Sequence, residues 1–549
     1  MNRESMQWVL LTAAGVLCLG QLYWFGTKCF LQISTDDIDY IGIARHIRNL
    51  QFHASINGFR SPLISWMIAA SSLPGSDPLR IAKAFSVASY LLCVVLLYIF
   101  TRRLWQSRLA ASLAVLLFSV ARGLAAVAVE MAVPDFLFTA LTLVYFILLL
   151  KCLRAGTSAS WFCLGAVHAL AFLCKAFAFP WLALSTVVAL VLSPPTSPRL
   201  KRFALAAILP TLVIASWAGV LHSKYGVYTT GTQFRANFLQ WTARAYNDRS
   251  HEIYGVLTDT KPFIDEYNVN DPMPPGSWPW RYRVPARFAL TRLASAEIHN
   301  LPKALKELLI LITPGGLLAF AYVVYVLFRR RVSAPTNFVF AAVALLGLLG
   351  ILFAYCMLAF DGRYLYPVIP PILAVTAGFF LPEVGPTSKA LRVAVNTLIV
   401  AGVLVSVLYP SSPFRKLDRD FQVSCYRAGG ILRSHAGSTV VSIGTGPYPE
   451  HGVGWEAGYK AAYFGDRRLI AAIDRLPNAS EMEPILRDVA AAAPDVVLVW
   501  GPPGDTRYDT LTRQLRNVGT ERAYEVILDP AVGPVGTAVF IAHGSLAAP

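Results

Sequence analysis

The chain is a succession of long apolar blocks separated by short basic segments, and this alternation limits what it can fold into. Hydrophobic residues make up 55% of the 549 and charged residues only 15%, with a mean hydropathy of +0.52. This composition excludes a soluble enzyme of this length. A helix needs about 17 to 25 mostly apolar residues to cross a bilayer. Blocks of that length predict about eleven membrane-spanning helices, near residues 7–26, 79–101, 108–126, 134–151, 160–176, 177–193, 203–221, 306–328, 336–359, 364–382 and 391–409.

The basic residues between these blocks predict the orientation. Lys and Arg cluster in alternate loops, all on one side of the predicted bundle, at 102–108, 151–154, 199–202, 329–331 and 389–392. By the positive-inside rule, that side and the N-terminus face the cytoplasm. The net charge of +16 therefore indicates membrane topology rather than nucleic-acid binding. No small-residue cleavage site follows the first block, which favours a retained helix over a signal peptide.

The opposite, extracytoplasmic side receives an acidic stretch just after the first block. Ser34–Tyr40 contains Asp36, Asp37 and Asp39, and carboxylates at a bilayer boundary usually face a ligand, a partner or water. The alternative is a helix cap, because Ser34, Thr35 or Asp36 could cap a helix that begins near Ile38. Both interpretations remain open. The residues that follow, 41–50, have the pattern of an amphipathic helix at the membrane interface.

Two further regions are predicted on that side. The loop 222–305 contains the aromatic and basic segment Trp278–Arg283, which either clamps the interface or takes part in function. After residue 410 the composition becomes that of a soluble α/β domain. We expect strands at 439–443 and 496–500, a hairpin from 524–528 and 538–542, and helices near 421–434, 479–492 and 508–517. The predicted domains are therefore a membrane domain, 1–410, with outer loops 27–78 and 222–305, and an extracytoplasmic α/β domain, 411–549.

Five motifs, in order along the predicted outer side, carry a resemblance to a known group. They are Asp36-Asp37 with Tyr40, Arg60-Ser61-Pro62-Leu63 with Trp66, Pro134-Asp135, Lys175, and Arg363-Tyr364-Leu365-Tyr366-Pro367. This pattern resembles the GT-C membrane glycosyltransferases, in particular the bacterial protein-mannosyltransferase and aminoarabinose-transferase group, families 39 and 83. The resemblance implies a GT-C fold and a polyprenyl-phosphate sugar as donor.

The resemblance also implies roles for the matching residues. Asp36, Asp37 and Asp135 would be catalytic, and Arg60, Lys175, Arg363 and Tyr364 would bind the donor phosphate. Two features depart from the pattern: Phe59 precedes Arg60 where the aminoarabinose transferases have an acidic residue, and the acidic pair is Asp-Asp rather than Asp-Glu. These departures put in doubt a divalent-metal site of the kind that some relatives have. The sequence does not require a metal, and it leaves the metal, the sugar and the acceptor open.

Physical chemistry supports the same division of roles. Transfer of a sugar to a hydroxyl needs a base, and Asp36 or Asp37 is a suitable carboxylate. The departing phosphate gains charge, which fixed cations stabilise. Arg363 is favoured because a guanidinium can hold two phosphate oxygens, although it could instead anchor the interface with Asp361.

These features predict an enzyme of the bacterial inner membrane that moves a monosaccharide from a polyprenyl-phosphate donor to a lipid, glycan or protein hydroxyl. Membrane lipids are its expected surroundings. Two alternatives remain. One is an oligosaccharide ligase that uses a polyprenyl-diphosphate donor. The other is a flippase or transporter of lipid-linked sugars, which should show repeated halves, broken helices or charges at the bilayer midplane.

Overall fold

The computed structural model describes residues 3–29, 32–121, 123–193, 199–237, 269, 286–330, 335–357, 360–408, 416–434, 439–444, 454–473, 476–501, 505–517, 524–528 and 537–542. The chain divides into two compact units, both discontinuous in sequence: Met1–Phe30, Arg60–Ala243 and Pro279–Pro413 form the first, and Leu31–Phe59, Arg244–Trp278 and Phe414–Pro549 the second. Residues 31–59, which we expected in the membrane domain, thus group with the C-terminal residues. The predicted aromatic segment Trp278–Arg283 lies outside the described residues.

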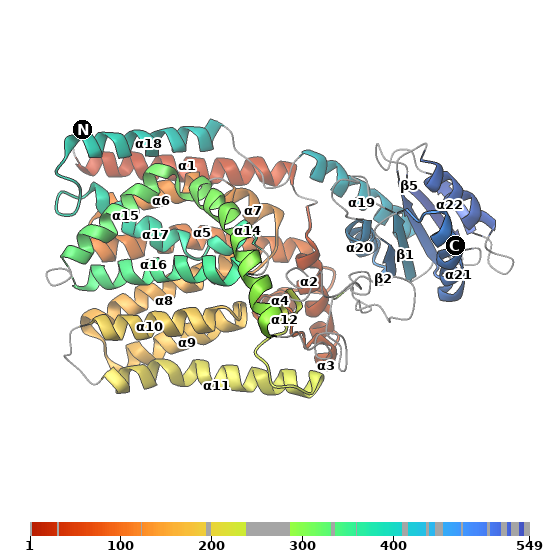
Figure 1. The fold of residues 1–549 in the computed structure, drawn as a ribbon, viewed down its shortest axis with the longest axis horizontal. Helices are drawn as coiled ribbons and strands as arrows, with labels where there is room; N and C mark the ends of the chain where they lie inside the picture. The colour runs from red at the N-terminus through yellow and green to blue at the C-terminus, as the bar shows by residue number, and fades with distance from the viewer. Residues whose placement is uncertain are drawn as a thin grey trace. The chain divides into compact units, whose positions relative to one another are not determined.

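The first unit is a bundle of helices, many of which run side by side (Figure 1). Its elements are α1 (Arg3–Lys28), α4 (Leu63–Ser71), α5 (Pro78–Trp105), α6 (Arg108–Val120), α7 (Leu124–Glu130), α8 (Asp135–Ala155), α9 (Ser158–Cys174), α10 (Ala178–Leu192), α11 (Arg199–Tyr225), α12 (Gln233–Asn237), α14 (Ala286–Ile312), α15 (Pro314–Arg329), α16 (Pro335–Cys356), η4 (Gly362–Leu365), α17 (Ile369–Thr376), η5 (Ala377–Phe380) and α18 (Lys389–Leu408).

Local sequence explains where several of these helices begin. Helix α5 begins with Asp77, whose side chain accepts a bond from the backbone of Leu79, and with Pro78 at its first position, where proline suits a helix. Ser107 caps α6 in the same way, accepting from the backbone of Ala110, and Thr157 caps α9. These side chains satisfy N–H groups that have no partner within the helix.

Five described helices are long and apolar enough to cross a membrane, within 4–28, 78–105, 135–154, 199–225 and 335–356. The number rises to seven if each of two bent helix pairs counts as one span, and three shorter apolar helices accompany them. The count of eleven stays a prediction. The blocks expected at 108–126 and 306–328 are not straight: α6 and α7 meet at 57°, and the last part of α14 meets α15 at 93°. The second bend falls at Thr313, whose φ is +67°, a value a helix does not accommodate.

Small residues allow the helices to approach closely, as is common between membrane helices. A Cβ atom placed on Gly315 of α15 would lie 2.6 Å from the backbone nitrogen of Ile399 in α18, and one on Gly165 of α9 would lie 2.6 Å from the carbonyl oxygen of Ala206 in α11. Neither position has room for a side chain. These glycines therefore set the spacing of the α15–α18 and α9–α11 pairs.

Basic residues gather at one end of the bundle. Arg154, at the end of α8, donates to the carbonyl oxygen of Arg103 at the end of α5, over 2.9 Å. The Arg202 guanidinium, near the start of α11, lies 5.7 Å from the ring centroid of Trp161, near the start of α9. Residues at the start of α8 and at the end of α9 consequently lie at the other end, roughly 30 Å away along α8.

The second unit contains a mixed five-stranded sheet. Its described elements are α2 (Thr35–Arg48), α3 (Phe52–Ser55), α19 (Lys416–Ser434), β1 (Thr439–Gly444), α20 (Gly454–Gly465), β2 (Arg468–Ile473), α21 (Ala479–Ala492), β3 (Val496–Trp500), α22 (Thr506–Asn517), β4 (Tyr524–Leu528) and β5 (Thr537–Ala542). The strand order is β2-β1-β3-β5-β4. Strand β1 pairs in parallel with β2 and β3, whereas β5 runs antiparallel to β3 and to β4, as the predicted hairpin requires.

Alternating side chains place a layer of helices on each face of this sheet. Val441, Ile443 and Val499 pack with Leu511 of α22 and Val489 of α21 in one buried cluster. On the other face, β1 meets α20, so closely that a Cβ atom on Gly458 would lie 2.2 Å from the Cβ of Ser442. Helices α19 and α2 both pack against α20.

Candidate active site

Asp135 stands at the first position of α8, where the partial positive charge of a helix N-terminus favours a carboxylate. Its side chain is 3% exposed. The turn is supported on both sides: the Thr139 hydroxyl donates to the Asp135 carbonyl oxygen over 2.8 Å, and the Cys174 thiol donates to the carbonyl oxygen of Pro134. The carboxylate is therefore held at the end of the bundle opposite the basic residues.

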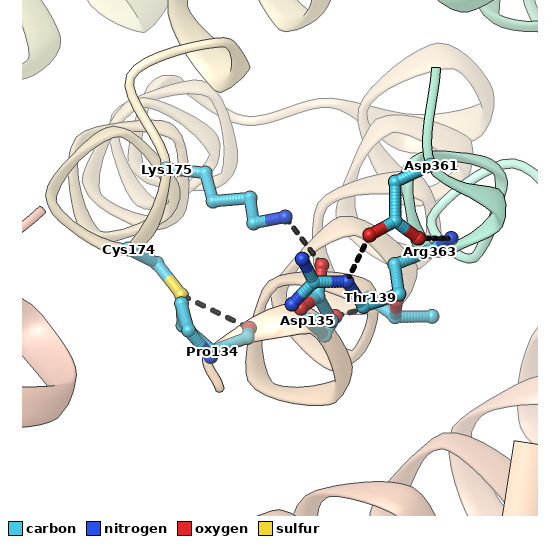
Figure 2. A network of polar contacts seen from close by, with 7 residues as sticks. All are labelled: Pro134, Asp135, Thr139, Cys174, Lys175, Asp361 and Arg363. Carbon is cyan, nitrogen blue, oxygen red and sulfur yellow. Dashed lines mark hydrogen bonds and ion pairs between the residues drawn. The ribbon is translucent and has the colours of Figure 1, made fainter. Parts of the chain in front are cut away.

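Lys175 lies directly after α9, in extended conformation, and forms an ion pair with Asp135 (Figure 2). Its side chain is 18% exposed, and its ammonium nitrogen lies 5.5 Å from the ring centroid of Tyr364. An ammonium carries three N–H donors, of which the bond to one carboxylate oxygen uses one. The pair thus fixes the ammonium while it can still donate to another oxygen.

Arg363 belongs to the short helix η4, which Asp361 caps. One oxygen of Asp361 accepts the backbone N–H of Arg363 at 3.0 Å, and the other accepts Nε of the same residue at 2.8 Å. The Arg363 side chain is 17% exposed. Figure 2 shows this ion pair and the Asp135–Lys175 pair in one network of polar contacts. Capping and ion pairing together set the direction of the guanidinium.

Aromatic rings hold η4 against the neighbouring helices. Tyr364 stacks on Tyr355 of α16, with ring centroids 3.9 Å apart, and Tyr366 stacks on Phe136, the residue after Asp135, at 5.5 Å. The first pair is half-buried and the second is buried, and stacking of this kind stabilises a fixed arrangement. The structure thus brings together four of the predicted site residues, Asp135, Lys175, Arg363 and Tyr364, from three separate motifs.

Arg60 lies in the same unit, in the bend before α4, and is 8% exposed. Helix α4 packs against α5 and against α9, the helix that ends next to Lys175. Trp66 of α4 contacts Trp217 of α11 edge to face, with centroids 6.3 Å apart. The motif around Arg60 is therefore part of the packed bundle.

The predicted acidic pair is in the second unit, at the start of α2. Ser34 caps this helix: its hydroxyl accepts the backbone N–H of Asp37 at 3.1 Å, and Asp37 Oδ2 accepts the backbone N–H of Ser34 at 2.8 Å. Asp37 is fully buried and Asp36 is partly buried. The cap foreseen as an alternative is present, with Ser34 and Asp37 as its partners. Catalytic roles for Asp36 and Asp37 stay predictions.

Sequence reasoning missed several supporting residues. Phe136 and Tyr355 had no motif of their own, because a ring that stacks on a motif residue is found only once the helices are packed. Asp39 was noted only as part of the acidic stretch, yet it is bonded to Tyr459. Within the described residues, no group of three or more His, Cys, Asp or Glu side chains is gathered as a metal ion needs.

Comparisons with known proteins relate this chain to membrane glycosyltransferases. Residues 59–220, which include Arg60, Asp135 and Lys175, match the family model of dolichyl-phosphate-mannose-protein mannosyltransferases. No curated protein matches the sequence significantly. The chain is similar to the crystal structure of ArnT from Cupriavidus metallidurans bound to undecaprenyl phosphate, with 13% identity, 98% of each chain covered and a TM-score of 0.54.

The chain is also similar to the archaeal oligosaccharyltransferase AglB from Archaeoglobus fulgidus, solved with an inhibitory peptide and a dolichol-phosphate. The identity is 14%, the match covers 97% of this chain and 74% of that chain, and the TM-score is 0.53. At such low identities the likeness concerns the fold. Together with the apolar helices, it shows an integral membrane protein with the GT-C fold, similar to the protein-mannosyltransferase and aminoarabinose-transferase group.

Proposed function

We propose that this chain is a glycosyltransferase that moves a monosaccharide from a polyprenyl-phosphate donor to an acceptor hydroxyl on the extracytoplasmic face of the bacterial inner membrane. In this proposal about eleven helices span the membrane, the N-terminus is cytoplasmic and the α/β domain is extracytoplasmic. The acceptor belongs to a lipid, a glycan or a protein.

The observation that carries this proposal is the cluster of Lys175, Arg363 and Tyr364 around Asp135, at the end of the bundle opposite the basic residues. Basic residues mark the cytoplasmic end of membrane helices, which supports an extracytoplasmic location for the cluster in this proposal. Two cations held in place at that end suit the phosphate of a lipid whose tail stays in the bilayer. ArnT of Cupriavidus metallidurans has been solved with such a lipid, undecaprenyl phosphate.

In the proposed reaction, the carboxylate of Asp36 or Asp37 removes the proton of the acceptor hydroxyl. The acceptor oxygen forms a bond to the anomeric carbon of the sugar while the bond from that carbon to the phosphate oxygen breaks. Both electrons of that bond go to the departing polyprenyl phosphate, so its negative charge increases, and Arg363, Lys175 and Arg60 stabilise it. Asp135 serves this step by holding the Lys175 ammonium.

Asp36 is the stronger candidate for the base. Asp37 is buried, and its Oδ2 accepts the Ser34 backbone N–H in the helix cap, whereas a base must come within hydrogen-bond distance of the acceptor hydroxyl. Asp36 is one residue earlier, at the first turn of α2, and is partly exposed.

An oligosaccharide ligase with a polyprenyl-diphosphate donor is the second candidate, because the fold is equally similar to an oligosaccharyltransferase. The two candidates differ in the donor that they consume. A flippase would move the donor lipid across the membrane without breaking the sugar–phosphate bond.

The test uses inverted and right-side-out membrane vesicles that contain the full chain. Radiolabelled polyprenyl-phosphate mannose is the first donor, with other polyprenyl-phosphate sugars and a polyprenyl-diphosphate oligosaccharide in parallel. We expect label to pass from a monophosphate donor to an acceptor, and Asp36→Asn to lower the rate by about two to four orders of magnitude. Asp77→Asn is the matched control, because Asp77 caps α5 and has no proposed role.

Transfer from the diphosphate donor alone would establish the ligase instead. Movement of labelled lipid without transfer would establish the flippase. Asp36→Asn activity within a factor of about three of wild type would remove Asp36 from the mechanism.

A further inference from the structure

We propose that the C-terminal α/β domain positions the acidic helix α2 for catalysis, and that Tyr459 does so through its hydrogen bond to Asp39. The inference rests on the proposed function for its catalytic part. It assigns a role to a domain in which the sequence shows no motif, and it names Tyr459 and Asp39 as positioning residues.

The first observation is that α2 and the α/β domain belong to the same compact unit, although 31–59 and 414–549 are far apart in the chain. Helix α2 packs against α20, which in turn covers β1 and β2. The Gln422 side-chain amide of α19 donates to the carbonyl oxygen of Ile33, just before α2, at 3.1 Å. The start of α2 is thus tied to the domain independently of α20.

The second observation is a buried polar bond between the two helices. The Tyr459 hydroxyl donates to Asp39 Oδ1 over 2.8 Å, and both residues are 1% exposed. A hydrogen bond to a charged group is stronger than one between neutral groups, and a buried carboxylate is costly unless it is well bonded. This bond therefore sets the direction of the Asp39 side chain, and burial makes the loss of the bond costly.

A third contact lies two turns further along α2. Arg45 Nη1 forms an ion pair with Asp466 Oδ1 at 3.2 Å, and the Arg45 guanidinium lies 5.5 Å from the ring centroid of Tyr463. Tyr459 and Tyr463 are four residues apart, so they share one face of α20, and Asp466 directly follows the helix. That face meets α2 along its length rather than at one point.

These contacts fix the rotation of α2 about its own axis. Asp36 precedes Asp39 by three residues, which places it about 60° around the helix, on a neighbouring position of the same side. When Tyr459 holds Asp39, the direction of Asp36 is determined. The cap of Asp37 with Ser34 keeps the first turn of α2 helical, so a rotation at Asp39 is passed on to Asp36.

The test compares Tyr459→Phe with Tyr508→Phe in the full chain. Tyr508 is the matched control, because it is also a buried tyrosine of the second unit but packs in the core of α21 and α22. Tyr459→Phe keeps the ring and removes only the hydroxyl. Hydrogen–deuterium exchange reports on α2 whatever the activity: residues 35–48 are expected to exchange about tenfold faster in Tyr459→Phe and at the wild-type rate in Tyr508→Phe. Equal exchange in the two variants would overturn the proposal.

The kinetic part uses the donor and acceptor of the transfer assay. Misplacement of a catalytic group costs rate more than binding, so Tyr459→Phe should lower kcat about 10- to 100-fold and leave the KM for the donor unchanged. Because the effect passes through Asp39, the double variant Tyr459→Phe/Asp39→Asn should be no slower than the slower single variant.

Each outcome bears on one claim. Faster exchange in α2 together with an unchanged kcat would overturn the catalytic positioning. Additive losses in the double variant would show that Tyr459 does not act through Asp39, which also overturns it. If wild type transfers no sugar but α2 exchanges faster in Tyr459→Phe, the proposed function fails while the attachment of α2 to the domain stands.

Discussion

Each cation of the cluster that the structure describes around η4 has a carboxylate partner, Lys175 with Asp135 and Arg363 with Asp361. The geometry of the two pairs differs. Asp361 accepts hydrogen bonds from both the backbone N–H and the side chain of Arg363, which orients the planar guanidinium. Asp135 accepts from a single ammonium nitrogen of Lys175. In the proposed reaction, shape would therefore matter for Arg363, whereas charge would be enough for Lys175.

At Arg363, the change to Lys is expected to lower kcat/KM for the donor although the charge is kept. A point charge does not replace a guanidinium that holds two phosphate oxygens, so the loss should be about 1.5–3 kcal/mol, or roughly one to two powers of ten. Arg363→Ala should be worse. Steady-state transfer at limiting donor measures both. Arg154→Lys, at the other end of the bundle, is the control. Normal rates in both Arg363 variants would leave Arg363 as an interface anchor only.

At this scale the sequence predicted Lys175, Arg363 and Tyr364 from their motifs, and the structure brings them together with Asp135. The sequence did not predict that Asp135 and Lys175 are partners, because they lie 40 residues apart and belong to different helices. The sequence offered Ser34, Thr35 or Asp36 as the cap residue and did not predict that Asp37 completes the cap, since a carboxylate at the third helical position can have many other roles.

At the scale of elements, the hydropathy of the sequence could not predict the bends between α6 and α7 and between α14 and α15. A hydropathy average over a window of residues records how apolar the window is, but not the backbone angle of one residue. Here the positive φ of Thr313 alone turns the chain. Pro314 gave a signal, because proline favours the start of a helix. The bend lets α15 turn away from α14 and pack against α18.

The packing of α15 on α18 predicts the effect of adding one methyl group. Gly315→Ala is expected to lower the stability of the detergent-purified protein by about 1–3 kcal/mol, the usual cost of overpacking, because the new Cβ would meet the backbone of Ile399 and Val395 at 2.6 and 2.8 Å. Gly350→Ala in α16 is the control, since nothing lies within 4 Å of its Cβ. Thermal unfolding measures both. Equal stability of the two variants would contradict the close approach of α15 and α18.

For the whole molecule, the charge pattern of the loops was the most informative signal in the sequence. It predicted one basic end of the bundle, and contacts of Arg154 and Arg202 place basic residues at one end. The charge pattern could not predict how the chain divides into its two compact units. Residues 31–59 follow an apolar helix and precede another, so hydropathy assigns them to a loop, and only packing against α20 shows that they belong with the C-terminal residues.

The proposed orientation predicts which residues an impermeant thiol reagent reaches on intact cells. A cysteine at Glu483, on the exposed side of α21, should react, and one at Gln106, exposed after α5, should react only after permeabilisation. The wild-type chain measures the background of its own cysteines. The reverse pattern would place the cluster around Asp135 in the cytoplasm and would end the proposal of an outer reaction.

The bond between Asp39 and Tyr459 joins residues 420 positions apart, and this separation has a consequence for synthesis. At the usual rate of translation, Tyr459 leaves the ribosome roughly 20 to 80 s after Asp39. Until then, α2 lacks the face of α20 against which it packs, and in a nascent chain stopped before Tyr459 its amides are expected to exchange freely. The acidic helix is therefore the last part of the proposed site to be completed, although it is among the first to be made. A copy of the protein stopped before Tyr459 would hold a membrane bundle with no positioned base, so it would not consume donor lipid before α20 has left the ribosome.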